Sequence, residues 1–190
     1  VASFVKRVAD EAPAGSLWRP GFALIASDLG FHGPAQRLLS EFAADGFAVP
    51  SDAKRSTTLV YFAEVCAALG DGTRAERLYE LLKPYGHMTI TAGVHTMCYG
   101  SAQRYLGILA NTFGAPELAE DHFENALAFD TSLRAPLWIA HTQCDYGRML
   151  RRRGTPADLA RADALLGAAW STAAKLGLRA LTDKLRHLQM

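Results

Sequence analysis

The segment GSAQRYLGILANTFGAPELAEDHF (residues 100–123) contains one complete copy of the pattern that predicts the fold. A large and a small residue stand side by side, a glycine follows seven residues after the small one, and an alanine and an aromatic residue come five and nine residues after the glycine. These positions are Leu106, Gly107, Gly114, Ala119 and Phe123. The glycine supplies a left-handed turn that ends one helix and lets the next fold back. Small residues let the two helices approach closely while large neighbours fill the space beside them. The segment therefore predicts a helical hairpin.

The same pattern recurs along most of the chain. The turn glycines are Gly30, Gly70, Gly114 and Gly154, at spacings of 40, 44 and 40 residues. The large–small pairs before them are Phe22–Ala23, Phe62–Ala63, Leu106–Gly107 and Tyr146–Gly147, and the alanines after the first three are Ala35, Ala75 and Ala119. In the fourth unit the alanine is displaced, and GTPAD (residues 154–158) indicates a small insertion before the second helix. One hairpin cannot bury its apolar stripe alone, so the pattern predicts a stack of hairpins.

The predicted fold is all-α, a right-handed α–α superhelix of about four stacked helical hairpins that ends in a capping helix. The paired segments are 17–29 with 33–44, 55–69 with 72–84, 93–113 with 115–129, and 135–152 with 156–176, followed by a last helix over 178–190. All 190 residues are assigned to a single domain. Because the chain opens on valine and VASFVKRVA (residues 1–9) already reads as amphipathic helix, we expect it to be a piece of a larger protein.

Composition limits the function classes. Apolar residues make up 49% of the chain and charged residues 21%, which is typical of globular domains. A formal net charge of +1 provides no general attraction to nucleic acid or to an acidic membrane surface. The three cysteines are an odd number without a CxxC pair, which favours a reducing, cytoplasmic setting. No apolar run is long enough for a membrane helix, and no signal peptide is visible.

The order of a large–small pair, a glycine, an alanine and an aromatic residue resembles the tetratricopeptide repeat, over roughly residues 16–177. The spacing exceeds the 34 residues typical of that family. The proline that often ends a unit is also missing after Gly114, where Asp130 and Thr131 stand instead.

A closer resemblance lies in the second half of the chain. It is carried, in order, by LYELLKPYG (78–86), GSAQRYLGILANTFG (100–114), AEDHFENALAFD (119–130) and TQCDYGRMLRRRG (142–154). This order resembles the C-terminal helical region of large bacterial signalling ATPases, which join an ATPase module to a nucleotidyl-cyclase-like domain or a LuxR-type DNA-binding domain. The resemblance implies a cytoplasmic regulator in which this region is the sensor or partner-binding arm. The chain itself lacks a GxxxxGK[ST] phosphate loop.

The candidate binding residues lie on the predicted inner groove, which the first helix of each hairpin lines in repeats of this type. The N-terminal half of the groove is mixed and apolar. Its positions are Leu17, Pro20, Leu24, Ser27 and Asp28 in the first unit and Thr57, Val60, Glu64, Ala67 and Ala68 in the second. The positions of the third unit are Ser101, Arg104, Ile108, Asn111 and Thr112, and those of the fourth are His141, Cys144, Arg148, Arg151 and Arg152. In the C-terminal half the groove is basic, and we predict that an acidic peptide segment or a carboxylate docks there, because the planar arginine fork binds carboxylates in a bidentate manner. The predicted site residues are Arg104, Asn111, His141, Arg148, Arg151 and Arg152. In the alternative interpretation Arg151, Arg152 and Arg153 are a solvated helix end, where positive charge suits the helix dipole.

No residue pattern indicates catalysis, a metal or a cofactor. The strings His95–Cys98 and His141–Cys144 could each offer two zinc ligands, but they stand at different places in their units. The acidic residues of the third unit are read as an exposed outer face, with Glu117 in the first turn of its helix: Glu117, Glu120, Asp121 and Glu124. We therefore expect a non-enzymatic scaffold that binds a protein or peptide, or another domain of its parent chain, and that binds neither a membrane nor nucleic acid directly.

Two further functions remain open at this point. The groove or a pocket between helices could sense a small ligand, which a pocket closed on several sides would favour. The last helix could also mediate homodimerisation, because its leucines form one stripe: Leu178, Leu181, Leu185 and Leu188. The same stripe would serve to cap the fourth hairpin.

Overall fold

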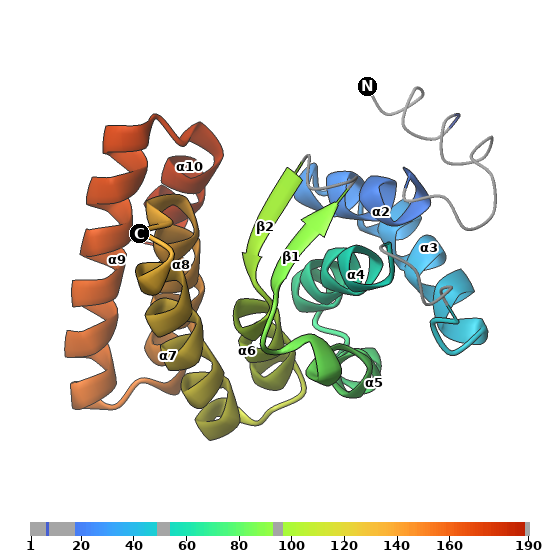
Figure 1. Ribbon diagram of the computed structural model, residues 1–190, viewed down its shortest axis with the longest axis horizontal. Coiled ribbons are helices and arrows are strands. Elements are labelled where there is room, and N and C mark those ends of the chain that lie inside the picture. Colours follow the sequence, from blue (N-terminus) through green and yellow to red (C-terminus); the bar gives the residue numbers. More distant parts are fainter. Residues whose placement is uncertain (1–6, 8–17, 49–53, 93–96, 189–190) are drawn as a thin grey trace.

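The computed structural model describes residues 7, 18–48, 54–92 and 97–188. Within these ranges helices dominate, and one short antiparallel strand pair interrupts them (Figure 1). The elements are α2 (Trp18–Asp28), α3 (His32–Ala44), α4 (Arg55–Leu69), α5 (Gly72–Leu82), the 3-10 turn η1 (Lys83–Tyr85), β1 (Thr89–Ala92), β2 (Met97–Ser101), α6 (Ala102–Thr112), α7 (Pro116–Ser132), α8 (Pro136–Arg153), α9 (Pro156–Leu176) and α10 (Arg179–Leu188). The mostly helical fold class is therefore confirmed.

Each predicted turn glycine adopts the left-handed conformation. The φ angles are +78° at Gly30, +67° at Gly70, +91° at Gly114 and +76° at Gly154. Residues other than glycine seldom adopt such angles, so the glycines end the first helix of each hairpin as predicted. The second helix begins two residues later in every case, at His32, Gly72, Pro116 and Pro156.

The small positions of the repeat lie where two helices touch. A methyl group added at Gly107 would lie 2.8 Å from the ring of Phe123, and one added at Gly147 would lie 2.7 Å from Leu166. In the first two hairpins the same position is alanine, and both alanines are fully buried. The alanines that follow the turns, Ala35, Ala75 and Ala119, are fully buried as well. The predicted close contacts between paired helices are confirmed.

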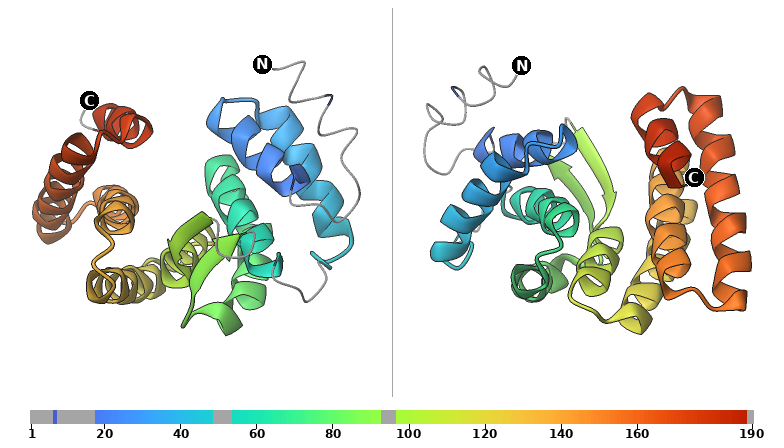
Figure 2. Two further views of the ribbon diagram at one scale, coloured as in Figure 1. Left: turned by 45° about the horizontal axis from the view of Figure 1, so that its top comes forward. Right: turned by 180° about the vertical axis from the view of Figure 1, so that it is seen from behind.

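The hairpins follow one another around an arc (Figure 2). Within the pairs, α2 packs on α3, α4 on α5, α6 on α7 and α8 on α9. Between the pairs, the first helices of successive hairpins contact each other, α2 with α4, α4 with α6 and α6 with α8. The first helices thus lie in sequence along the inside of the arc, while α2–α3 and α9–α10 form its two ends.

The strand pair corrects the predicted third unit. A helix was expected over 93–113, but α6 begins only at Ala102, and the residues before it form β2, which pairs antiparallel with β1. Residues 93–96 of that prediction lie outside the described ranges. The Ser101 side chain accepts a hydrogen bond from the Gln103 backbone N–H at 3.2 Å and so caps the start of α6. Gly100 has a φ of +77° and lies against the indole of Trp138 on α8, where an added methyl group would come within 2.7 Å.

In the fourth unit, the structure differs from the insertion that was expected before the second helix. The residues after Gly154 form an additional first turn of α9, closed by reciprocal hydrogen bonds between Thr155 and Asp158. This turn moves the buried small residue of the second helix to Ala162. The extra residues therefore lengthen the helix instead of preceding it.

The last helix, α10, covers the end of the stack. Leu181 and Leu185 are buried, and Leu178 and Leu188 are partly buried. They pack in one cluster with residues of α8 and α9, namely Ala140, Cys144, Leu166, Ala169, Trp170 and Ala173. The leucine stripe is therefore used within the chain, as the capping interpretation predicts. In the described part of the chain, no helix combines the length and the apolar character needed to cross a membrane.

A buried carboxyl near the strand pair is expected to make stability depend on pH. Asp130 of α7 is 1% exposed, one side-chain oxygen accepts a hydrogen bond from the Ser101 backbone, and the other has no hydrogen-bond partner among the described residues. Burial raises the pKa of this carboxyl from 3.8 to about 6. Between these two values the folded state binds more protons than the unfolded state, so the contribution of Asp130 to stability rises as the pH falls.

Asp130→Asn removes this proton linkage. Between pH 7.5 and pH 5, we expect the free energy of unfolding of the original chain to improve by about 1 to 1.5 kcal/mol relative to that of the variant. Urea titrations of both proteins at the two pH values measure this difference. A difference that does not change with pH would contradict the prediction.

Candidate binding pocket on the inner face of the arc

A pocket of about 170 Å³ opens on the inside of the arc, where the first helices of all four hairpins and α10 come together. Its lining residues are Asp28 of α2, Glu64, Ala67 and Ala68 of α4, Arg104 and Ile108 of α6, Asp145 and Arg148 of α8, and Lys184 of α10. All of them except Asp145 and Lys184 stand at positions that the repeat pattern assigns to the groove. The sequence pattern therefore locates most of the pocket wall.

Four charged side chains form a continuous ion-pair ladder across the pocket wall, made of Glu64, Arg104, Asp145 and Lys184. An Arg104 guanidinium nitrogen lies 3.1 Å from a Glu64 oxygen, and another lies 2.7 Å from an Asp145 oxygen. The second Asp145 oxygen accepts a hydrogen bond from the Lys184 ammonium at 2.8 Å. The ion-pair ladder thus joins α4, α6, α8 and α10 in order.

Asp145 and its two cationic partners, Arg104 and Lys184, hold each other in their charged forms. Burial alone would raise the pKa of the Asp145 carboxyl, but the charges of Lys184, Arg104 and Arg148 outweigh it and hold that pKa far below its ordinary value. The charge of Asp145 in turn raises the pKa of Lys184. Asp145 is therefore ionised throughout the physiological pH range.

Arg104 does not have the role that the sequence pattern predicts for it. Its side chain is 2% exposed, both of its ionic partners belong to the protein, and its guanidinium lies over the Tyr105 ring at 4.8 Å. A side chain held in this way is not free to dock a partner's carboxylate. The correct description of Arg104 is a buried structural cation beneath the pocket.

Two charged groups of the pocket remain available. Among the residues that the structure describes, the side chains of Asp28 and Arg148 make no hydrogen bond and no ion pair, and both line the pocket. Asp28 is exposed at the rim, and Arg148 is partly buried. These two groups, one acidic and one basic, are the polar contacts that the pocket can offer to a ligand.

The other predicted site residues are dispersed. Arg151 pairs with Asp163 at 2.7 Å and also donates to the Leu188 carbonyl oxygen, which fastens the end of α10. Arg152 is exposed, and Asn111 is partly buried outside the pocket lining. His141 lies one turn before Asp145 beside the Trp138 ring, and burial followed by the charge of Arg104 lowers its pKa to about 4. The structure therefore places only Arg104 and Arg148 of the six predicted residues in the pocket.

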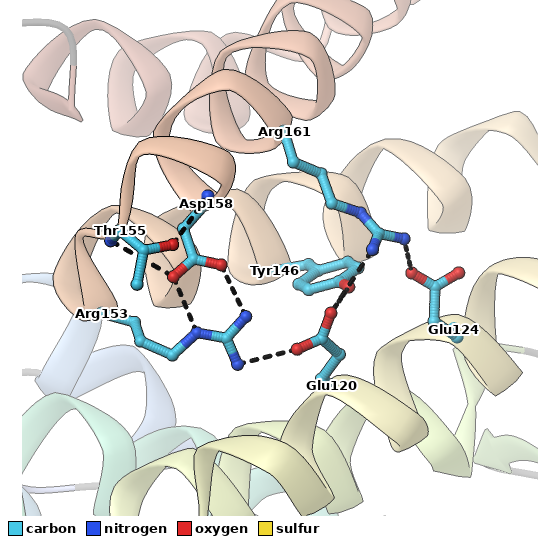
Figure 3. Close-up of polar contacts among 7 residues, drawn as sticks. All are labelled: Glu120, Glu124, Tyr146, Arg153, Thr155, Asp158 and Arg161. Carbon is cyan, nitrogen blue, oxygen red and sulfur yellow. Dashed lines mark hydrogen bonds and ion pairs between the residues drawn. The ribbon is translucent and has the colours of Figure 1, made fainter.

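A second charged cluster lies between α7, α8 and α9 (Figure 3). Arg153 makes bidentate hydrogen bonds to Asp158 at 2.9 and 2.6 Å and lies 2.7 Å from Glu120. Arg161 of α9 reaches Glu120 and Glu124 of α7. The cluster ties the third hairpin to the fourth. Glu120, Glu124, Arg151 and Arg153 all take part in ion pairs, and all four side chains also keep partial exposure to solvent. Arg151 and Arg153 stand in the last turn of α8, as the helix-end interpretation expects.

Of the three cysteines, Cys66 and Cys144 are buried as packed side chains, whereas Cys98 on β2 is exposed. Burial raises the pKa of the Cys66 thiol to about 12 and that of Cys144 to about 11, so both are protonated at neutral pH. Within the described ranges, no group of three histidine, cysteine or acidic residues is arranged to hold a metal ion. His95, one member of the proposed zinc strings, lies outside these ranges.

Comparison of the chain with protein-family models, curated proteins and solved structures finds no match in any of the three. The chemistry of the pocket is therefore argued from its own geometry.

Proposed function

We propose that this chain is a non-enzymatic binding scaffold of the tetratricopeptide type, a right-handed superhelix that serves as the partner-binding arm of a cytoplasmic bacterial signalling regulator. The observation that carries the proposal is the pocket, because the first helix of every hairpin contributes to its lining. Within it, Arg148 is a cation that has no counter-ion bonded to it. Stacked helical hairpins generally bind partners on the concave face of the stack.

The partner group that suits Arg148 is a carboxylate. A guanidinium binds a carboxylate through two parallel hydrogen bonds, and removal of bulk water inside a pocket strengthens them. Arg152 follows four residues later on the same side of α8 and is exposed, so it extends the positive surface beyond the pocket. An acidic side chain or a C-terminal carboxylate of a protein partner fits this arrangement.

Selection from a phage-displayed library of random peptides tests this proposal. With the full 190-residue chain as bait, we expect enriched peptides to share an acidic residue, and Arg148→Gln to weaken their binding by about 10-fold or more, as loss of a hydrogen bond to a charged group implies. Arg77→Gln, on the exposed side of α5, is the matched control and should leave binding unchanged. Enriched peptides that bind Arg148→Gln as tightly as the original chain would refute the proposed site.

A second function, the sensing of a small ligand, is favoured by one observation. The pocket is bordered by five helices, α2, α4, α6, α8 and α10, and these include both ends of the arc. A pocket bordered by this many helices suits a compact molecule as well as a protruding side chain.

A further inference from the structure

The charges of the pocket are separated by sign. The acids Asp28 and Glu64 come from α2 and α4, and the bases Arg148 and Lys184 come from α8 and α10. Arg104 and Asp145 lie between them as an internal pair. The pocket thus has an acidic end and a basic end, although its lining has equal numbers of acidic and basic side chains.

The acidic end attracts a cation. Partial burial at the pocket rim and then the neighbouring charge of Glu64 raise the pKa of the Asp28 carboxyl, and the charge of Lys184 acts against them. Glu64 already contacts Arg104, whereas Asp28 has no bonded counter-ion. A positive group placed beside Asp28 would relieve the repulsion between the two carboxylates.

The basic end attracts an anion. Arg104, Lys184 and Arg148 all act on the single carboxylate of Asp145. Two of these cations are bonded to it, and Arg148 is the third. Glu64 and Asp145 together offset the charges of Arg104 and Lys184, so Arg148 is the cation of the pocket lining that no bonded carboxylate offsets.

The volume of the pocket limits the size of the occupant. An apolar cavity of about 150 Å³ can hold a molecule the size of benzene, whereas drug-sized ligands generally occupy about 300 Å³ or more. A pocket of about 170 Å³ therefore suits a group of few non-hydrogen atoms.

We infer that the pocket binds a small zwitterion of the α-amino-acid type, with its carboxylate on Arg148 and its ammonium group at Asp28. This inference rests on the proposed binding role of the inner face and adds the chemical class of a free ligand. The zwitterion leaves no net charge in the pocket and satisfies both groups that lack a bonded partner. Because Asp28 and Arg148 belong to α2 and α8, the ligand also links the first hairpin to the last.

The test is thermal unfolding of the full chain with each of the twenty L-amino acids as probe. For a probe at ten times its dissociation constant, we expect the midpoint Tm to rise by about 3 to 5 °C. The N-acetyl derivative of an active probe lacks the cation and its carboxamide lacks the anion, so each should give a shift of less than about 1 °C. Asp28→Asn and Arg148→Gln should each weaken binding of the free amino acid by about 10-fold or more, while Arg77→Gln should not.

The outcomes separate this inference from the proposed function. If no amino acid shifts the Tm but acidic peptides still require Arg148, the zwitterion site is refuted and the scaffold stands. If the N-acetyl derivative binds as tightly as the free amino acid, the pocket is an anion site and the role given to Asp28 is wrong. If a free amino acid binds, if Asp28→Asn and Arg148→Gln both weaken that binding, and if no peptide is selected, the zwitterion site is supported. The proposed binding of a protein partner is then refuted.

Discussion

Replacement of Arg104 by methionine is expected to lower the free energy of unfolding by about 3 to 5 kcal/mol. Methionine keeps an unbranched side chain, shorter than that of arginine, and removes the cation that lies between Glu64 and Asp145. Asp145 is 6% exposed, so its carboxylate would stay buried with Lys184 as its remaining bonded partner. A buried charge that loses a partner keeps its desolvation cost, and this makes the loss larger than that of an exposed ion pair. Chemical denaturation measures the change.

Two further variants separate the loss of the ion pair from a general effect of the substitution. Arg37→Met, at an exposed position of α3, should change the free energy of unfolding by less than about 0.5 kcal/mol. The double variant Arg104→Met with Asp145→Asn should lose less than the sum of the two single variants, because each removes the same interaction. Additive losses, or a loss near that of Arg37→Met, would show that the buried pair does not contribute in this way.

Replacement of Gly147 by alanine is expected to lower the free energy of unfolding by about 1 to 3 kcal/mol. The added methyl group would lie 2.7 Å from the Cγ atom of Leu166 and 3.3 Å from the backbone oxygen of Ala162, so α8 and α9 must move apart to accept it. The cost comes from overpacking, since alanine is otherwise the better helix former.

Gly167 on α9 provides the matched control. It also lies inside a helix, but nothing stands within 4 Å of a methyl group added there. Gly167→Ala should therefore stabilise the chain by about 0.5 to 1 kcal/mol. Opposite signs for the two substitutions, measured by the same denaturation experiment, would support the close approach of α8 and α9. A stabilising Gly147→Ala would contradict it.

The parts of the fold that follow from local chemistry could be predicted from sequence. The left-handed turns at Gly70 and Gly154 and the close contacts at Gly107 and Gly147 depend on the absence of a side chain, and a glycine reveals that directly. A stack of hairpins then places the same helix face of each unit on the inner side. Most pocket residues could be identified for that reason.

The strand pair could not be predicted by counting residues back from Gly114. A helical spacing can be extended along the sequence past the residue at which the helix really begins. Two local signals were present. Ser101 is a favoured helix cap, and Gly100 immediately before it permits the left-handed turn that the chain makes there. What holds the strands in place is tertiary, namely the packing of Gly100 on Trp138 and of Tyr99 edge-on to Tyr61. Contacts across such distances in the sequence leave no periodic pattern.

The roles of the arginines depended on partners far along the chain. Arg104 and Asp145 are 41 residues apart, and Lys184 comes from the capping helix, which has no counterpart in the repeat. A groove position shows on which face of its helix a residue lies. It does not show whether a carboxylate from the next hairpin already neutralises the charge of that residue. For this reason Arg104 and Arg148, which occupy groove positions in consecutive hairpins, take opposite roles.

The ion-pair ladder also bears on how the chain opens. In a linear stack each unit touches its neighbours alone, so end units can separate from the rest at little free-energy cost. Here Asp145 shares its charge with one residue of the third hairpin and one of the capping helix, and Arg104 does the same with the second and fourth hairpins. Release of α10 therefore also disturbs the carboxylate that neutralises the centre of the stack. Local opening of the C-terminal end is thereby coupled to the middle hairpins, which makes unfolding more cooperative than contacts between neighbouring helices alone would make it.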